Sequence, residues 1–483
     1  MLGNDADHLA EGCAQQPQSV VCIPLPAIDP GDLGPTAVPL WFADGPAVVA
    51  WDRHYGDVVL ARFGAVPPFK PMPRLALAGV PIDAPVVGDP SGPRGGVAEP
   101  GSDVGRVVDA TVDAAGSLHV AFRDDSGDSL RYLRVLADGV VEGRHVVASG
   151  DGIGASIAIG VTFDGAPVVA TFSPADPVAG GLARLRLYAA KTAAVASAAQ
   201  WSVVPVASVP VAAVPPPCGG GCPVGAACVV GPGAGAGTGG DACVTPAAGC
   251  VGCLPAQVCA AGGVCRSLRL PPAPLARLPA GPGGFLSLAT RGASVALAAG
   301  DAHAGSLVVY RGPRSGPLTA TAVDQAKTLG AQSDISHFPA VAIDTKGALW
   351  LLGQEARRGQ VFLAHLPVEA AAWQISVLDD GMRDDGPHRV GADCHLLLGA
   401  DGPALAVWQD TRAGRTVYAR LDPDGKVVER AEFEPPSGIG GFSGGAVDVS
   451  TTAATLMSSY LTPGTATRPR AAIDLQRVVW GGE

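Results

Sequence analysis

Residues 105–122, with the sequence GRVVDATVDAAGSLHVAF, decide the fold. The segment holds two glycines eleven positions apart, Gly105 and Gly116, with Asp113 shortly before the second glycine and an apolar run after it. A glycine with a nearby aspartate marks a tight turn, and short apolar runs rich in branched residues favour strands. The segment therefore predicts two antiparallel strands joined by a turn.

The same spacing recurs along the chain, about every fifty residues where no long loop intervenes. The first and second positions of the seven copies are Gly34 and Gly45, Gly105 and Gly116, Gly154 and Gly165, Gly281 and Gly292, Ser336 and Gly347, Gly391 and Gly402, and Gly440 and Thr451. Each module has room for four short strands, which cannot bury both faces of a sheet unless the modules stack radially. The sequence predicts an all-β fold, a seven-bladed β-propeller.

The last module ends after its third strand, which we expect at residues 471–480. Apolar residues 20–28 precede the first module, and we predict that they supply the missing fourth strand, because ring closure removes an exposed sheet edge. The predicted organisation is an N-terminal tail at 1–19, the closing strand and blades one to three at 20–214, a cysteine-rich insert at 215–268 and blades four to seven at 269–483.

Ten of the eleven cysteines are predicted to form disulfides. They are Cys13, Cys22, Cys218, Cys222, Cys228, Cys243, Cys250, Cys253, Cys259 and Cys265. The last eight form two similar quartets in a segment too rich in Gly and Pro to bury a core. We therefore expect disulfides to stabilise this segment. Zinc is the alternative, which the absence of a nearby histidine disfavours. Cys394 is expected to be a buried free thiol. The quartets resemble the EGF-like or Dickkopf-type inserts of extracellular proteins.

The 483 residues carry a formal net charge of −11 without a run of basic residues, which excludes a nucleic-acid partner. Predicted disulfides indicate an oxidising compartment, hence a secreted or cell-surface protein, although residues 1–13 do not have the pattern of a signal peptide. Residues 192–214 are apolar, but Pro205 and Pro210 favour extended backbone over a membrane-spanning helix. No transmembrane segment, metal or cofactor is expected.

Several motifs that carry chemistry elsewhere have a simpler interpretation in this chain. Ser443 lies in a nucleophile-elbow pattern, but its module predicts a strand with no following helix. Residues 235–240 match a dinucleotide-binding spacing inside the cysteine-rich insert, where a loop is expected. The polar cluster at 379–395 could bind a cation or do acid–base work, and a solvated loop is the preferred interpretation. Asp422 and Asp424 predict a hairpin turn.

The loops just before the first strands of the modules should gather at one mouth of the central channel. Asp32, Asp103, Asp334 and Arg389 hold equivalent positions there, and Arg106 and His337 follow closely. We predict these six as ligand-binding residues, with turn capping as the alternative role of the acids.

Residues 112–122 and 342–350 resemble the repeats of secreted bacterial propellers of the sialidase-like (BNR-repeat) group. That group has Ser or Thr two positions before its aspartate and one residue between this aspartate and the glycine, and Asp344 has neither. The arginine triad and the Tyr and Glu pair of a sialidase cannot be placed in the sequence. The resemblance therefore implies a propeller and transfers no catalytic residue.

The resulting expectation is a non-enzymatic propeller that binds an extracellular protein or a glycan. One alternative is a glycoside hydrolase or lyase with acidic residues at the channel mouth, and another is a structural component of an extracellular assembly. Paired acids in a deep pocket would favour the enzyme, a flat rim would favour the binding module, and a large exposed apolar patch would favour the structural component.

Overall fold

The computed structural model describes most of the chain. The described residues are 11–16, 19–24, 31–175, 181–211, 224–229, 242–248, 250, 253, 257–267, 281–302, 304–399, 402–433, 439–447, 453–462 and 470–479. They belong to two compact units. Unit 1 comprises residues 1–174, 184–208 and 281–483, and unit 2 comprises residues 175–183 and 209–280.

Unit 1 contains six four-stranded antiparallel sheets, each built from strands consecutive in the chain. The first three sheets are β3 (Leu33–Phe42), β4 (Gly45–Asp52), β5 (Asp57–Arg62) and β6 (Leu75–Ala78); β7 (Val104–Val112), β8 (Leu118–Asp124), β9 (Ser129–Val135) and β10 (Val141–Ser149); and β11 (Ser156–Val161), β12 (Pro167–Ser173), β13 (Gly181–Ala190) and β14 (Trp201–Val211). The next three are β19 (Phe285–Arg291), β20 (Ser294–Asp301), β21 (Ser306–Pro313) and β22 (Thr319–Ala322); β23 (His337–Ile343), β24 (Leu349–Glu355), β25 (Gln360–Leu366) and β26 (Gln374–Asp379); and β29 (Val390–Leu398), β30 (Pro403–Asp410), β31 (Arg415–Leu421) and β32 (Val427–Phe433).

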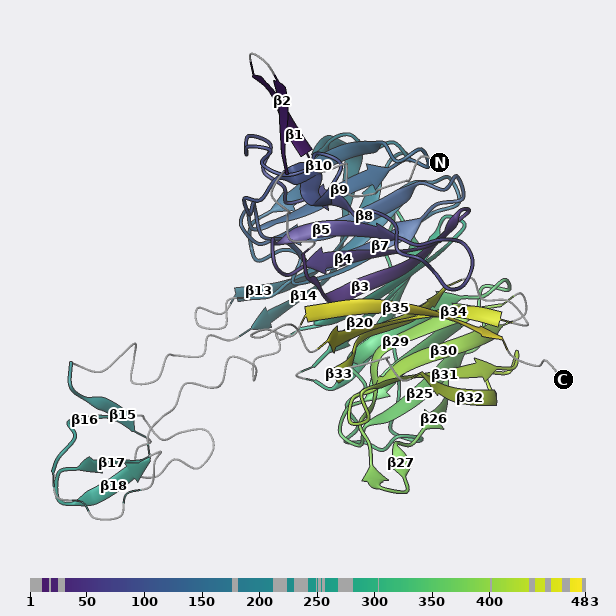
Figure 1. Ribbon diagram of the computed structural model, residues 1–483. Coiled ribbons are helices and arrows are strands. Elements are labelled where there is room, and N and C mark those ends of the chain that lie inside the picture. The colour runs from purple at the N-terminus through teal and green to yellow at the C-terminus, as the bar shows by residue number, and fades with distance from the viewer. Residues whose placement is uncertain are drawn as a thin grey trace. The chain divides into compact units, whose positions relative to one another are not determined.

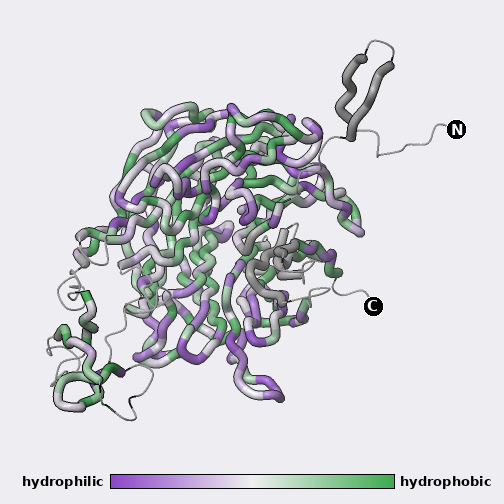
Figure 2. Tube along the Cα trace, turned by 60° about the vertical axis from the view of Figure 1, so that its left-hand side comes forward, coloured by the Kyte–Doolittle hydropathy of each residue, from purple (hydrophilic) through white to green (hydrophobic). Residues whose placement is uncertain are grey.

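These sheets are the blades of a β-propeller. The first strand of each sheet contacts the first strand of the next sheet, and a three-stranded sheet, β33 (Ile439–Val447), β34 (Ala453–Thr462) and β35 (Arg470–Val479), contacts both the sixth blade and the first. In Figure 1, β35 accordingly lies beside β3. Separate apolar clusters fill the spaces between neighbouring sheets, as between the first two blades and between the fifth and sixth. Figure 2 shows hydrophobic stretches running through the sheets.

The prediction of seven four-stranded blades is confirmed for six. The seventh sheet has three strands, because the strand expected to complete it pairs elsewhere. This strand, β2 (Ser19–Pro24), forms a hairpin with β1 (Glu11–Gln16), in which Cys13 is the register partner of Cys22. Pairing between two segments that are adjacent in the sequence costs far less chain entropy than pairing with a strand at the other end of the sequence. Residues 25–28 of the predicted closing strand lie outside the described residues.

The eleven-residue spacing joins two places where the backbone is left-handed. Gly105 lies near the start of β7 with φ +87°, and a Cβ there would meet Val58 of the preceding blade at 2.5 Å. Gly116 lies in the β7–β8 turn with φ +80°. Asp113 closes that turn, because its carboxylate accepts hydrogen bonds from the amides of Ala115 and Ser117. The repeat therefore marks one innermost strand and its hairpin turn.

The proline-containing stretch that follows residue 200 is strand β14, the outermost strand of the third blade. Pro205 and Pro210 are tolerated there because an edge strand leaves one row of amide positions unpaired. Within the described ranges, no helix has the length and hydropathy that a membrane crossing needs.

Unit 2 holds two small hairpins. They pair β15 (Ala227–Val229) with β16 (Ala242–Val244), and β17 (Gln257–Ala260) with β18 (Val264–Ser267). Disulfides join Cys250 to Cys259 and Cys253 to Cys265, and Cys243 is also disulfide-bonded. The prediction of disulfides over zinc is confirmed for the second quartet, since oxidised sulfurs cannot serve as thiolate ligands. Cys218 and Cys222 lie outside the described residues.

Reduction is expected to unfold unit 2 while the propeller stays folded. The short hairpins of unit 2 have little core, so the two disulfides that close loops of 9 and 12 residues supply much of its order. Limited proteolysis with and without a phosphine reductant would show new cleavage within residues 250–267, while the propeller fragments survive. Equal protease resistance before and after reduction would contradict the expectation.

Candidate functional site

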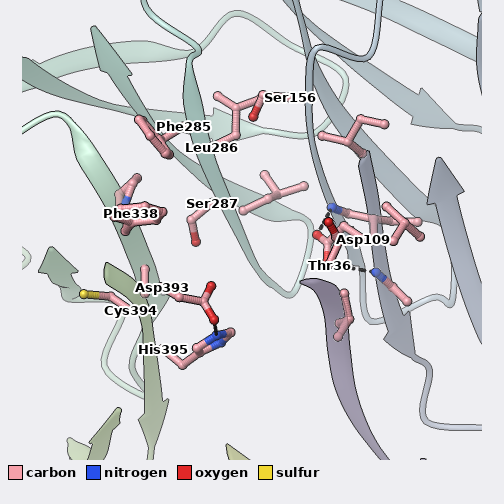
Figure 3. A pocket seen from close by; sticks show the side chains of 18 of the residues that line it. Thr36, Asp109, Ser156, Phe285, Leu286, Ser287, Phe338, Asp393, Cys394 and His395 are labelled. Atoms are coloured by element: carbon pink, nitrogen blue, oxygen red, sulfur yellow. Dashed lines mark hydrogen bonds and ion pairs between the residues drawn. The ribbon is translucent and has the colours of Figure 1, made fainter. Parts of the chain in front are cut away.

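A cavity of about 620 Å³ lies where the innermost strands of the six blades converge. Residues of β3, β7, β11, β19, β23 and β29 line it. Most of its lining residues are apolar, and its titratable residues are Arg106, Asp109, Asp393, Cys394 and His395. Figure 3 shows Asp109 on one wall and Asp393 with His395 on the other. The cavity therefore brings together two carboxylates that are far apart in the sequence.

Asp109 lies on β7 and connects it to the next blade. The amide of Ile159 on β11 donates to its Oδ2 at 2.8 Å, and the amide of Ala110 donates to its Oδ1 at 2.8 Å. Burial raises the pKa of Asp109 to about 6, although these two amides and the charge of His395 act to lower it. A carboxyl group with this pKa holds its proton for part of the time near neutral pH and can act as a general acid.

Asp393 and His395 lie on β29, on the same side of the strand. Nε2 of His395 lies 3.4 Å from Oδ2 of Asp393. Burial lowers the pKa of His395, but the charges of Asp393 and Asp109 and a hydrogen bond to Asp393 outweigh this effect, so the net shift is upward. The imidazolium form of His395 is thus favoured beside the Asp393 side chain.

Backbone strain occurs at this wall of the cavity. Asp393 has φ +50° and Phe338, on the neighbouring β23, has φ +49°; both lie at register shifts in their strands. A left-handed conformation at a non-glycine residue costs about 1–3 kcal/mol and tends to occur at functional sites. Phe338 packs against Phe285 with a centroid distance of 4.7 Å, and both rings line the cavity.

The four predicted rim residues are equivalent in the structure. The backbone carbonyls of Asp32, Asp103, Asp334 and Arg389 each accept a hydrogen bond from the residue after β4, β8, β24 or β30, respectively. The side chains of the three aspartates among them also form ion pairs: Asp32 with Arg53, Asp103 with Arg106, and Asp334 with His337. We call this side of the ring the entrance face, and the opposite side, with the β7–β8 and β23–β24 turns, the turn face.

The structure brings only one of the six predicted ligand-binding residues into the central cavity. This residue is Arg106, which also lies over the ring of Trp51 at 5.5 Å. His337 packs against Phe285 at 4.9 Å beside the cavity. A ligand-binding role for the six stays a prediction.

The polar cluster at 379–395 divides into two parts. Residues 379–388 form the end of β26, the small hairpin of β27 (Met382–Arg383) and β28 (Gly386–Pro387) and the following loop, whereas Asp393 and His395 belong to the cavity wall. The loop interpretation is therefore wrong for these two residues. Sequence reasoning also missed Asp109. The signal that could have found it is an acid in an otherwise apolar innermost strand.

The remaining motifs have structural roles. Ser443 lies inside strand β33 with Ser459 as its register partner, so no strand-to-helix elbow is present there. Asp422 closes the β31–β32 turn by accepting hydrogen bonds from the amides of Asp424 and Lys426. Cys394 is free and buried, as predicted, and burial raises its pKa. Residues 235–240 lie outside the described residues.

No protein-family model matches this sequence, and no curated protein does. Among solved structures, the chain is similar to an α-L-arabinanase from Penicillium chrysogenum complexed with arabinobiose, with 11% identity, a TM-score of 0.44 and coverage of 77% of this chain and 92% of the other. It is similar to an α-L-arabinofuranosidase from Fusarium graminearum, with 10% identity, a TM-score of 0.43 and the same coverage. It is also similar to a polysaccharide lyase, with 10% identity, a TM-score of 0.41 and coverage of 94% and 91%.

The expectation of a non-enzymatic binding module is corrected in favour of the hydrolase or lyase alternative, on the geometry of the central cavity. The three similar structures are enzymes that act on carbohydrates, and at 10–11% identity their likeness to this chain is one of fold. The site geometry agrees with this correction, because two carboxylates line one cavity and most of the predicted rim residues lie outside it. The resemblances to sialidase-like propellers and to EGF-like modules stay predictions, as does secretion, with which the disulfides are compatible.

Proposed function

We propose that this protein is a glycoside hydrolase whose reaction takes place in the central cavity. The observation that carries the proposal is the pair of dissimilar carboxylates in that cavity. The pKa of Asp109 is raised to about 6 by burial, whereas Asp393 is paired with His395. Hydrolysis of a glycosidic bond needs one carboxylic acid and one carboxylate, and opposite environments are how proteins keep two such groups in different protonation states.

The proposed roles follow from the charges. Asp109 donates its proton to the glycosidic oxygen as the bond from this oxygen to the anomeric carbon breaks. Asp393 accepts a proton from the attacking water, or attacks the anomeric carbon itself before water releases the sugar. His395 is a positioning residue that pairs with the Asp393 side chain. Phe285 and Phe338 offer ring faces on which the apolar face of a sugar can lie.

A lyase is the second candidate, because a histidine beside a carboxylate can abstract a proton next to a uronate carboxyl group. The upward shift in the pKa of His395 disfavours this role, since a base must be unprotonated. Product analysis separates the two reactions: hydrolysis yields saturated ends, whereas elimination yields an unsaturated sugar that absorbs ultraviolet light.

The pH dependence of cleavage tests the proposal. We expect kcat/KM to fall as the pH rises through about 6, because Asp109 then loses the proton it must donate. The assay measures new reducing ends from arabinan, polygalacturonate, dextran sulfate and dextran across the pH range. In His395→Gln the fall of kcat/KM on the alkaline side of the pH profile should move to higher pH, because the imidazolium charge that lowers the pKa of Asp109 is gone. No cleavage of any polysaccharide at any pH, or a fall unmoved by the substitution, would count against the assignment.

A further inference from the structure

A second cavity, of about 360 Å³, lies on the entrance face beside the fifth and sixth blades. Its charged lining consists of Arg357, Arg358, His388, Arg389 and Arg412. No carboxylate lines it in the described part of the chain. This concentration of positive charge is notable in a chain whose formal net charge is −11.

The arginines of this cavity keep their charge available. Arg357 and Arg389 are exposed and take part in no ion pair among the described residues. Arg358 donates to the carbonyl of Leu329 at 2.7 Å, and Arg412 donates to the carbonyl of Pro387 at 2.7 Å. A neutral carbonyl fixes a guanidinium without cancelling its charge, so Arg358 is held in place for an anion, whereas Arg412 also approaches a carboxylate, that of Asp385.

The nearest carboxylates are engaged elsewhere. Glu355 is buried and accepts hydrogen bonds from the amides of Asp334, Arg357 and Arg358. Asp410 is buried and contacts Nδ1 of His388 at 2.6 Å, and Asp385 contacts Nε2 of the same ring at 2.8 Å and approaches Arg412 at 3.7 Å. Asp385 and Asp410 are thus matched by His388 and Arg412, which leaves the charges of Arg357, Arg358 and Arg389 in excess of that of Glu355.

We propose that this cavity, hereafter the arginine cavity, binds an anionic group of the substrate, a uronate carboxylate or a sulfate ester of an acidic polysaccharide. The inference rests on the proposed function and names its substrate class. Guanidinium groups bind both oxyanions through paired N–H donors. Arg389 directly precedes β29, so it lies about 13 Å along the chain from Asp393 at 3.3 Å per residue. In this proposal, one polysaccharide chain occupies both cavities at once.

Binding measured apart from turnover tests this inference. The probes are polygalacturonate for carboxylates, dextran sulfate for sulfate esters and dextran as the neutral reference, titrated by calorimetry into the full chain carrying Asp109→Asn. We expect the double variant Arg357→Gln/Arg389→Gln to weaken binding of at least one anionic probe tenfold or more, with a smaller dependence on salt, and to leave dextran unaffected. Comparison of the two anionic probes identifies the ester or the carboxylate.

The matched control is Arg291→Gln/Arg311→Gln. These two arginines line a separate cavity near the β23–β24 turn, on the turn face. An equal loss of binding in both double variants would indicate attraction by net charge alone and would overturn the proposal, as would anionic probes that bind no better than dextran. Failure of the proposed function is a different result: polysaccharides would bind the arginine cavity and remain uncleaved by the wild-type protein.

Discussion

Asp109→Asn is expected to lower kcat/KM for the cleaved polysaccharide by about 100- to 10,000-fold, the usual contribution of a general acid. Asparagine keeps an oxygen that can accept the hydrogen bond from the amide of Ile159, so the link between β7 and β11 survives. What disappears is the proton that Asp109 holds up to a pH of about 6. Initial rates of reducing-end release, with circular dichroism to verify folding, measure the effect.

Ser287→Ala is the control for Asp109→Asn. Ser287 lines the same cavity and joins two blades in the same way, because its Oγ accepts a hydrogen bond from the amide of Val341 at 3.0 Å. It has no proton to donate as an acid, so its removal should change kcat/KM by less than about tenfold. If the two substitutions reduced activity equally, or if Asp109→Asn kept most of the wild-type rate, Asp109 would serve only to join the blades.

Arg94→Ala is expected to lower the free energy of unfolding by about 3–5 kcal/mol, because it leaves a charged partner buried and unpaired. Nε of Arg94 lies 2.5 Å from Oδ2 of Asp57, and these side chains are 4% and 0% exposed. The guanidinium also lies over the ring of Tyr55 at 4.0 Å and donates to the carbonyls of Val97 and Glu99. It thereby fastens the long loop between β6 and β7 to the first blade. Urea denaturation followed by tryptophan fluorescence measures the loss.

Two further variants show whether the buried charge is the cause. Arg420→Ala removes a partly exposed pair with Glu429, in which Nε and Oε2 are 3.4 Å apart, and should cost less than about 1 kcal/mol. Asp57→Asn added to Arg94→Ala should restore part of the stability, because burial already disfavours the charged form of Asp57 and raises its pKa. Similar losses in Arg94→Ala and Arg420→Ala, or no recovery in the double variant, would contradict this explanation.

The blades were predictable because their signals are local. Gly116 and Asp113 belong to one hairpin turn, and the alternation of apolar residues in a strand depends on near neighbours. The same locality explains the error at the ring closure. Residues 20–28 have the composition of a strand, but composition does not specify a partner, and β2 pairs with the adjacent β1.

The candidate site could be predicted only in part. The equivalence of Asp32, Asp103, Asp334 and Arg389 follows from the repeat, and their matching backbone hydrogen bonds confirm it. Asp393 and His395 were visible as members of a polar cluster, but a register shift and a left-handed backbone at Asp393 bring them to the cavity wall. Such a local distortion depends on packing against β23 and β30, which a single strand's sequence does not contain.

The sequence by itself determined the repeated hairpins, the module length and the cysteines that cross-link unit 2. The reason is that turns, strand periodicity and short disulfide loops involve residues close together in the chain. The tertiary structure alone decided which charges meet. Asp109 and Asp393 come from the second and sixth blades, and the arginine cavity is assembled from three separate segments of the chain. Radial stacking of the blades sets both arrangements, since charges act through space on whatever the fold places nearby.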